Sequence, residues 1–130
     1  MLQSKIAETI SEWVEKALDL PFTIYSDLIP YEDGDGACVR HDPTPAAEKR
    51  FIDGTRLVAW NFTFYTRCKN AFLARDYGKQ IVDKLDGATV ISAEEIKIEC
   101  EAVTLPQYID TDAKGYTTYC QSVKCTFLEE

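Results

Sequence analysis

The sequence predicts one α+β domain, in which an antiparallel or mixed β-sheet of five to six strands is flanked by two α-helices. Two segments carry apolar residues at helical spacing, and the segments between and after them alternate apolar and polar residues as strands do. The 130 residues, 45% of them hydrophobic, are enough to form one core. Residues 1–130 contain no internal repeat or low-complexity tract, so we expect a single domain.

The first helix is expected from Ser4 to Leu18, with Ser4 as its N-cap. Pro21 should end this helix, because proline lacks the amide hydrogen that continues a helix. The segment Phe22–Ser26 then predicts a short strand. The apolar face of the helix consists of Ile6, Ile10, Trp13, Val14 and Ala17.

The segment from Tyr31 to Asp53 has the weakest pattern in the chain. Its sequence EDGDG is typical of a turn, and Ala37–His41 predicts a strand that would form a hairpin around Gly34–Gly36. The following Pro-rich connection, up to a turn at Asp53–Gly54, is long for a compact domain. Loops of this length usually have a function or are mobile.

The strongest signals lie between Arg56 and Leu85. A long strand is expected over Thr55–Arg67, and a helix over Asn70–Asp86, with Gly87 in a left-handed conformation after its end. One face of the strand should be buried, and it carries Val58, Trp60, Phe62 and Phe64. The other face is mixed and carries Leu57, Ala59, Asn61, Thr63 and Tyr65. The expected buried face of the helix consists of Leu73, Tyr77, Ile81 and Leu85.

The pattern of the last third of the chain predicts mainly strands. Ala88–Ser92 predicts a short strand, and Glu94–Thr104 alternates so sharply that one of its faces should be exposed to water. The sequence PQYIDTDAKG that follows is expected to be a turn-rich loop, before a final long strand over Tyr116–Leu128.

The net charge and the lack of membrane signals argue against several functions. The net charge of −8 disfavours binding to duplex DNA, because neutralised phosphates supply most of that affinity. The aromatic stripe of Trp60, Phe62 and Phe64 is explained better by burial than by base stacking, which needs a basic surround. No run reaches the roughly 18 apolar residues that span a bilayer. The N-terminus lacks the pattern of a signal peptide, so we expect a cytoplasmic protein.

Residues for catalysis or metal binding are sparse. The five cysteines form no CxxC pair and are expected to be reduced structural thiols. Glu32, Asp33 and Asp35 suggest a calcium loop, but the expected flanking strands favour an acidic turn. His41 is the one histidine and should be exposed, without partners for a catalytic site. We therefore expect no enzyme activity, no metal and no cofactor.

The order of these elements, with the FTFY strand at Phe62–Tyr65 and the P-x-Y-x-D-x-D-x-x-G-Y segment at Pro106–Tyr116, resembles a phage family. Over nearly its whole length the chain is similar to the minor capsid or tail-terminator (tail completion) proteins of long-tailed bacteriophages and phage-tail-like particles. The resemblance implies a tail-terminator-like fold. It also implies a structural virion protein of the tail or neck, assembled in the bacterial cytoplasm.

Members of this family form a ring, typically hexameric, that caps the tail tube, stops its polymerisation and offers a surface to the head-side connector. The implied partners are therefore further copies of this chain, the tail tube protein and the head–tail connector protein. DNA would pass through the ring without sequence-specific binding, and no membrane is involved. The resemblance transfers no catalytic residue.

Subunit and tube contacts are expected at loops, strand edges and the basic junction between the long strand and the second helix. The same basic residues could instead pair with a neighbour's carboxylates or be solvated. The candidates are Tyr31, Glu32, Asp33, Asp35, Arg40, His41, Arg67, Lys69, Arg75, Tyr108, Asp110, Asp112 and Lys114. Two other functions stay open: a head–tail adaptor or other minor capsid protein, and a small-molecule-binding α+β domain with an apolar pocket.

Overall fold

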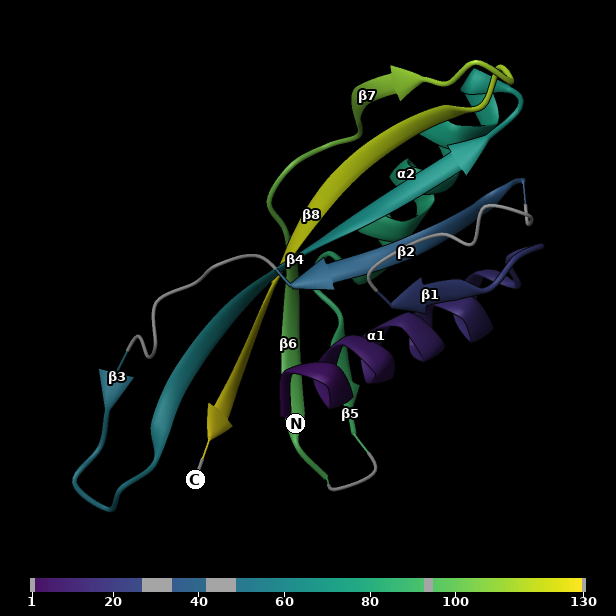
Figure 1. Cartoon of the computed structure of the whole chain (residues 1–130). Helices are drawn as coiled ribbons and strands as arrows, with labels where there is room; N and C mark the ends of the chain where they lie inside the picture. The colour runs from purple at the N-terminus through teal and green to yellow at the C-terminus, as the bar shows by residue number, and fades with distance from the viewer. Residues whose placement is uncertain (1, 27–33, 42–48, 93–94, 130) are drawn as a thin grey trace.

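The computed structural model describes residues 2–26, 34–41, 49–92 and 95–129. In these residues the chain forms two helices and one sheet (Figure 1). In chain order the elements are α1 (Leu2–Leu18), β1 (Ile24–Ser26), β2 (Gly36–His41), β3 (Lys49–Arg50), β4 (Arg56–Cys68), α2 (Ala71–Leu85), β5 (Thr89–Ile91), β6 (Lys97–Ala102), β7 (Gln107–Thr111) and β8 (Thr117–Glu129).

The sheet is mixed, which confirms the predicted α+β class. Its continuous path has the order β1-β2-β4-β8-β6-β5, and the short strands β3 and β7 pair with β4 and β8 beside this path. The pair β1–β2 is parallel, and the other pairs formed by the described strands are antiparallel. The six strands of the path agree with the predicted number.

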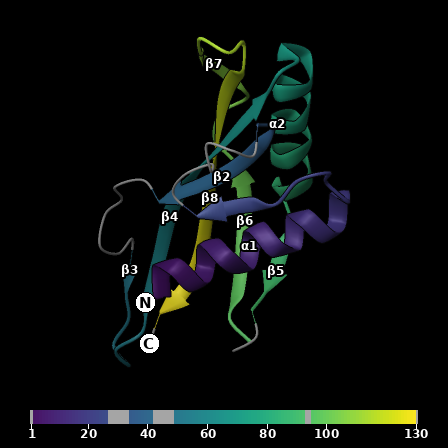
Figure 2. The ribbon, with the colours of Figure 1, turned by 45° about the vertical axis from the view of Figure 1, so that its right-hand side comes forward.

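The two long strands β4 and β8 form the axis of the molecule. Each has 13 residues, and they pair from Arg56 opposite Glu129 to Cys68 opposite Thr117. At about 3.3 Å per residue, the pair is roughly 40 Å long. One end carries the turn between β3 and β4, which we call the hairpin tip (Phe51–Thr55). The other end carries the start of α2 together with β7, and both views show the two ends far apart (Figures 1 and 2).

Both helices cover the same face of the sheet and close one hydrophobic core with it. The predicted apolar stripe of β4 is confirmed, because Val58, Trp60, Phe62 and Phe64 are all buried. They pack in one cluster with Ile6, Ile10 and Val14 of α1 and Ile81, Val82 and Leu85 of α2. Burial of these side chains is the main source of stability, at about 1.5–3 kcal/mol for each large apolar residue.

The helix α2 begins and ends where its capping residues predict. The Asn70 side chain accepts hydrogen bonds from the amides of Phe72 (2.9 Å) and Leu73 (3.4 Å), and Gly87 has φ +79° after the end. The predicted buried face is wrong at its first residue, since Leu73 is 41% exposed. The buried line runs instead through Ala74 and Gly78, because these small residues let the helix approach the sheet closely.

Two further predictions are corrected. The expected hairpin around Gly34–Gly36 is wrong, because β1 runs parallel to β2. A carboxylate oxygen of Glu15 on α1 accepts a hydrogen bond from the Ile24 amide, which ties the start of β1 to the helix that precedes it. The turn-rich loop before β8 in fact contains the strand β7. Its side chains are all exposed, so burial left no alternation in its sequence.

The helix α1 begins at Leu2, so the prediction of Ser4 as its N-cap is wrong. The other strands differ from prediction mainly at their ends. The strand expected over Phe22–Ser26 begins at Ile24, and the strand expected over Glu94–Thr104 is β6. In β6 the predicted exposed face is confirmed, because Glu99 and Glu101 are exposed while Ile98 and Cys100 are buried. Among the described residues, no helix is long and apolar enough to cross a membrane.

Candidate assembly surfaces

Several predicted site residues that are distant in the sequence meet where β4 joins α2. The Arg67 Nε donates a hydrogen bond to the Gly34 carbonyl oxygen at 2.7 Å, and the Lys69 amide donates to Asp35 Oδ1 at 2.8 Å. The Lys69 ammonium group also donates to the carbonyl oxygen of Lys114. This junction cluster therefore joins three separate segments of the chain. Arg67 and Lys69 stabilise the junction itself, in addition to any contact with a partner.

The ring of Tyr116 lies at the centre of this cluster. The Arg67 guanidinium carbon is 5.8 Å from the ring centroid, and the Lys69 nitrogen is 5.1 Å from it. Cations at these distances are attracted by the negative face of an aromatic ring. Tyr116, the last residue of the P-x-Y-x-D-x-D-x-x-G-Y segment, thus contacts both cations of the basic junction that precedes α2.

The side chain of Asp112 stabilises the turn between β7 and β8. Asp112 Oδ1 accepts hydrogen bonds from the amides of Lys114 and Tyr116, both at 2.9 Å, and Gly115 has φ +88°. Asp112 is therefore a turn-forming residue. On β7 itself, Tyr108 and Asp110 are exposed, as expected for contact residues. The Tyr108 hydroxyl lies 2.9 Å from Thr111 Oγ1, which fixes the ring along the strand.

The two candidates on β2 lie on opposite faces of the sheet. Arg40 is exposed, with its guanidinium carbon 4.9 Å from the centroid of the Tyr65 ring. The expected exposure of His41 is wrong, since its ring is half-buried and lies 5.1 Å from the ring centroids of Trp60 and Phe62. The alternation of strand faces places His41 on the core side. The remaining candidates lie outside the described residues: Tyr31, Glu32 and Asp33.

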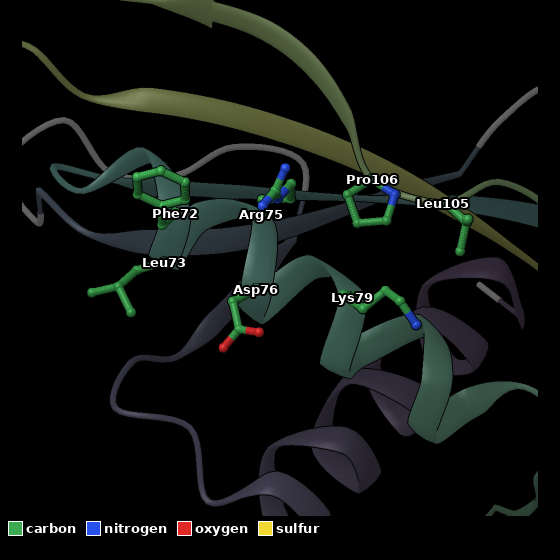
Figure 3. Close-up of a pocket in the computed structure, with 7 residues that line it drawn as sticks. All are labelled: Phe72, Leu73, Arg75, Asp76, Lys79, Leu105 and Pro106. Carbon is green, nitrogen blue, oxygen red and sulfur yellow. The ribbon is translucent and has the colours of Figure 1, made fainter.

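A groove that the sequence did not predict lies between α2 and the segment that connects β6 to β7 (Figure 3). Phe72 is 74% exposed in it and Leu105 is 61% exposed. The groove has a volume of about 640 Å³. Its lining residues, drawn in Figure 3, are Phe72, Leu73, Arg75, Asp76, Lys79, Leu105 and Pro106. Of the predicted contact residues, Arg75 alone is among those that line it.

The charged side chains of the groove each have a partner on α2. The Arg75 guanidinium carbon lies 5.8 Å from the Phe72 ring centroid. Lys79 forms an ion pair with Asp83 at 2.5 Å, and Asp76 accepts a hydrogen bond from Gln80 at 2.8 Å. The groove lining therefore combines apolar side chains with two cations and one carboxylate. In the sequence, Phe72 was the one indication of this groove, because it is a large apolar residue outside the apolar face predicted for α2.

The hairpin tip is a second exposed apolar surface. Ile52 is fully exposed at its apex, and Phe51 is exposed beside it. The turn is well defined, because the Phe51 amide donates to the Thr55 carbonyl oxygen at 2.9 Å. Asp53 accepts hydrogen bonds from the Thr55 hydroxyl (2.7 Å) and amide (3.1 Å), and these bonds lower the pKa of Asp53. The tip therefore presents an apolar side chain next to an ionised carboxylate.

The carboxylates and thiols of the described residues bear on the expectations for metal binding and for the cysteines. They contain no group of three His, Cys, Asp or Glu side chains that could hold a metal ion. The five cysteines are reduced thiols, and Cys100 and Cys125 lie in the core with their sulfur atoms 3.8 Å apart. Burial raises the pKa of the Cys68 thiol to about 12, so this thiol is protonated at neutral pH.

Comparisons with known proteins bear on the fold. No family model matches the sequence, and no curated protein matches it. Twelve chains of solved structures do match. One of them superposes over 97% of this chain and 92% of its own length, with a TM-score of 0.53 and 13% sequence identity. At this identity the likeness shows the α+β fold alone, since one fold serves many functions.

Proposed function

We propose that this protein is a structural subunit that forms a ring on the end of a phage tail tube, stops its polymerisation and offers the head-side joining surface. The main support for an assembly role is the presence of two unlike apolar surfaces at opposite ends of β4. One is the hairpin tip with Ile52, and the other is the groove with Phe72 and Leu105. Exposed apolar clusters on a soluble protein commonly mark interaction sites.

Unlike surfaces favour a ring over a simple dimer. A twofold dimer uses one self-complementary patch on both subunits, whereas a contact between two different patches repeats from copy to copy. Such a contact closes into a ring when the rotation between neighbours divides a full turn. The tip and the groove differ in shape and charge, and they lie roughly 40 Å apart along β4. This is the arrangement that a repeating contact requires.

The tail-specific part of the proposal rests on the resemblance described above. Its two sequence stretches lie in the central strand β4 and in β7 with the following turn. The net charge of −8 suits a ring through which DNA passes without being held. The partners would be other copies in a hexamer, the tail tube protein and the head–tail connector protein, and the location would be the neck of the virion.

The experiment that tests this function removes the protein from an assembling particle. Tails of uncontrolled length, without heads, are expected by electron microscopy if the protein terminates tail growth. Complementation with the wild-type protein should restore uniform tails. Tails of normal length next to unjoined heads would overturn the terminator function and favour a head–tail adaptor. Normal, infectious particles would overturn both.

One observation favours a second function, the binding of a small molecule in the groove. Its volume of about 640 Å³ is within the usual range for ligand sites, and apolar side chains and cations meet there. This function predicts a stable monomer or dimer that no tail tube converts into a ring. Sedimentation of the purified protein with and without isolated tail tubes separates the two functions.

A further inference from the structure

We propose that neighbouring subunits are joined by the hairpin tip of one copy, which inserts Phe51 and Ile52 into the groove of the next copy between Phe72, Leu105 and Pro106. This inference deepens the proposed ring and rests on it. It assigns a defined contact to each of the two surfaces, and the occupant of the groove is a second copy of this chain.

The chemistry of the two surfaces is complementary at the centre of the contact. The tip offers two large apolar side chains, and Ile52 has no cover in its own subunit. The groove offers the exposed ring of Phe72 and the side chains of Leu105 and Pro106, with space for a ligand larger than these two side chains. Insertion would remove both apolar surfaces from water, which is the main driving force for association.

One pair of opposite charges can form at the edge of the contact as well. Asp53 follows Ile52 directly, and its carboxylate is ionised at neutral pH and fully exposed. Arg75, Asp76 and Lys79 line the groove, and Lys79 is paired with Asp83, so Arg75, beside the Phe72 ring, is the cation that Asp53 would meet. Two copies of a chain with a net charge of −8 repel each other over most of their surface. A contact that places Asp53 beside Arg75 brings opposite charges together and selects the register of the tip in the groove.

The geometry makes this contact intermolecular. The tip precedes the first residue of β4, and the groove lies beside the helix that follows the last one, so the length of β4 separates them (Figure 1). A tip therefore cannot reach the groove of its own subunit. Each copy carries one tip and one groove, so every copy can bind two neighbours. Repetition of this contact gives a ring if it closes.

The test uses one charged substitution in each surface and a matched control. Ile52→Asp alters the tip, and Phe72→Asp alters the groove. Ile91→Asp is the control, because Ile91 is 65% exposed on β5, outside both surfaces. The three variants should keep the circular dichroism spectrum and melting temperature of the wild type. Ring formation on isolated tail tubes is measured by electron microscopy, and association by sedimentation.

Each of the first two variants should lose more than about tenfold in ring population, while Ile91→Asp should assemble as the wild type does. An equimolar mixture of Ile52→Asp and Phe72→Asp is the sharper measurement. The intact tip of the Phe72→Asp copy should bind the intact groove of the Ile52→Asp copy. The mixture should therefore form dimers and no rings, since the second contact of each copy is blocked.

A charge exchange tests the register of the contact. Asp53→Arg should weaken assembly, and Asp53→Arg combined with Arg75→Glu in the same chain should restore it. Restoration would not occur if the two residues only kept their own subunit folded.

Several outcomes would overturn the inference while the proposed function survives. Rings that form normally from Ile52→Asp or Phe72→Asp would show that other surfaces join the subunits. Loss of assembly for the groove variant alone would show that the tube protein or another segment occupies the groove. If the wild type forms no ring on tubes and tails are normal without it, the proposed function itself fails.

Discussion

A single position at the end of β4 shows how the surroundings of a residue decide its chemistry. Cys68 looks in the sequence like any free thiol, yet it is completely buried. Burial and, to a smaller extent, the negative charge of Asp35 raise its pKa to about 12. The next residue, Lys69, is exposed but tied to Asp35, Lys114 and the ring of Tyr116. The last residue of β4 and the residue that follows it therefore have different roles, one in the core and one in the junction cluster.

The raised pKa of Cys68 predicts how stability depends on alkaline pH. Its ordinary value is 9.0 and its folded value about 12, so the neutral thiol is favoured in the folded state. Its contribution is fully present below pH 9 and is lost as the pH rises through about 12. In Cys68→Ala, the free energy of unfolding should therefore fall less steeply above pH 9 than in the wild type.

Urea unfolding at several pH values measures both slopes, and a second measurement checks the cause. Below pH 9, native Cys68 should react far more slowly with a thiol reagent than the same residue in urea. Equal slopes for the variant and the wild type, together with rapid labelling of native Cys68, would contradict the assignment.

The helix α2 shows what an element requires beyond its periodic pattern. At Gly78 the helix lies so close to β8 that an added Cβ atom would be 2.1 Å from the side-chain oxygen of Gln121. Gln121 is fully buried and donates a hydrogen bond from Nε2 to the Phe64 carbonyl oxygen at 2.9 Å. It therefore cannot turn aside without losing this bond. Nearer the start of α2, Phe72 and Leu73 are exposed beside the groove.

Gly78→Ala should destabilise the fold. Overpacking against Gln121 costs about 1–3 kcal/mol, and the better helix propensity of alanine offsets up to about 1 kcal/mol. Urea denaturation should therefore show a net loss of about 1–2 kcal/mol in the free energy of unfolding. Lys84→Ala, on the exposed side of the same helix, is the control and should stay within about 0.5 kcal/mol of the wild type.

A double-mutant cycle identifies the contact that is responsible. Adding Gln121→Ala to Gly78→Ala removes the atoms that clash. The double variant should therefore lose less free energy of unfolding than the sum of the losses in the two single variants. Additive effects would show that the helix is held close to the sheet by other contacts.

The whole molecule combines an acidic surface with apolar side chains at its two ends. The net charge of −8 opposes self-association, and the tip and the groove favour it. These forces respond differently to salt. Screening weakens the repulsion between copies, whereas the apolar contact is not weakened by sodium chloride. If the chain assembles as proposed, its association should therefore respond to salt in the opposite way to that of a DNA-binding protein.

Association on tail tubes should increase between about 0.05 M and 0.5 M sodium chloride, as measured by sedimentation. Under the same conditions, binding to duplex DNA should stay negligible at every salt concentration. Ile52→Asp should show no increase, because it lacks the apolar contact. A decrease for the wild type would mean that the pairing of Asp53 with Arg75 outweighs the apolar contact.

The sequence by itself determined the α+β class, the presence of two helices, the buried stripe of β4 and the end of α2 just before Gly87. These features depend on local spacing and capping, which are visible along one chain. Only the tertiary structure decided that β1 is parallel to β2, that β7 is a strand and that Leu73 is exposed. The same holds for the meeting of Asp35, Lys69 and Lys114, and for the groove and the tip at opposite ends. These depend on which strands pair and how closely α2 lies on the sheet, and both are set by contacts between residues far apart in the sequence.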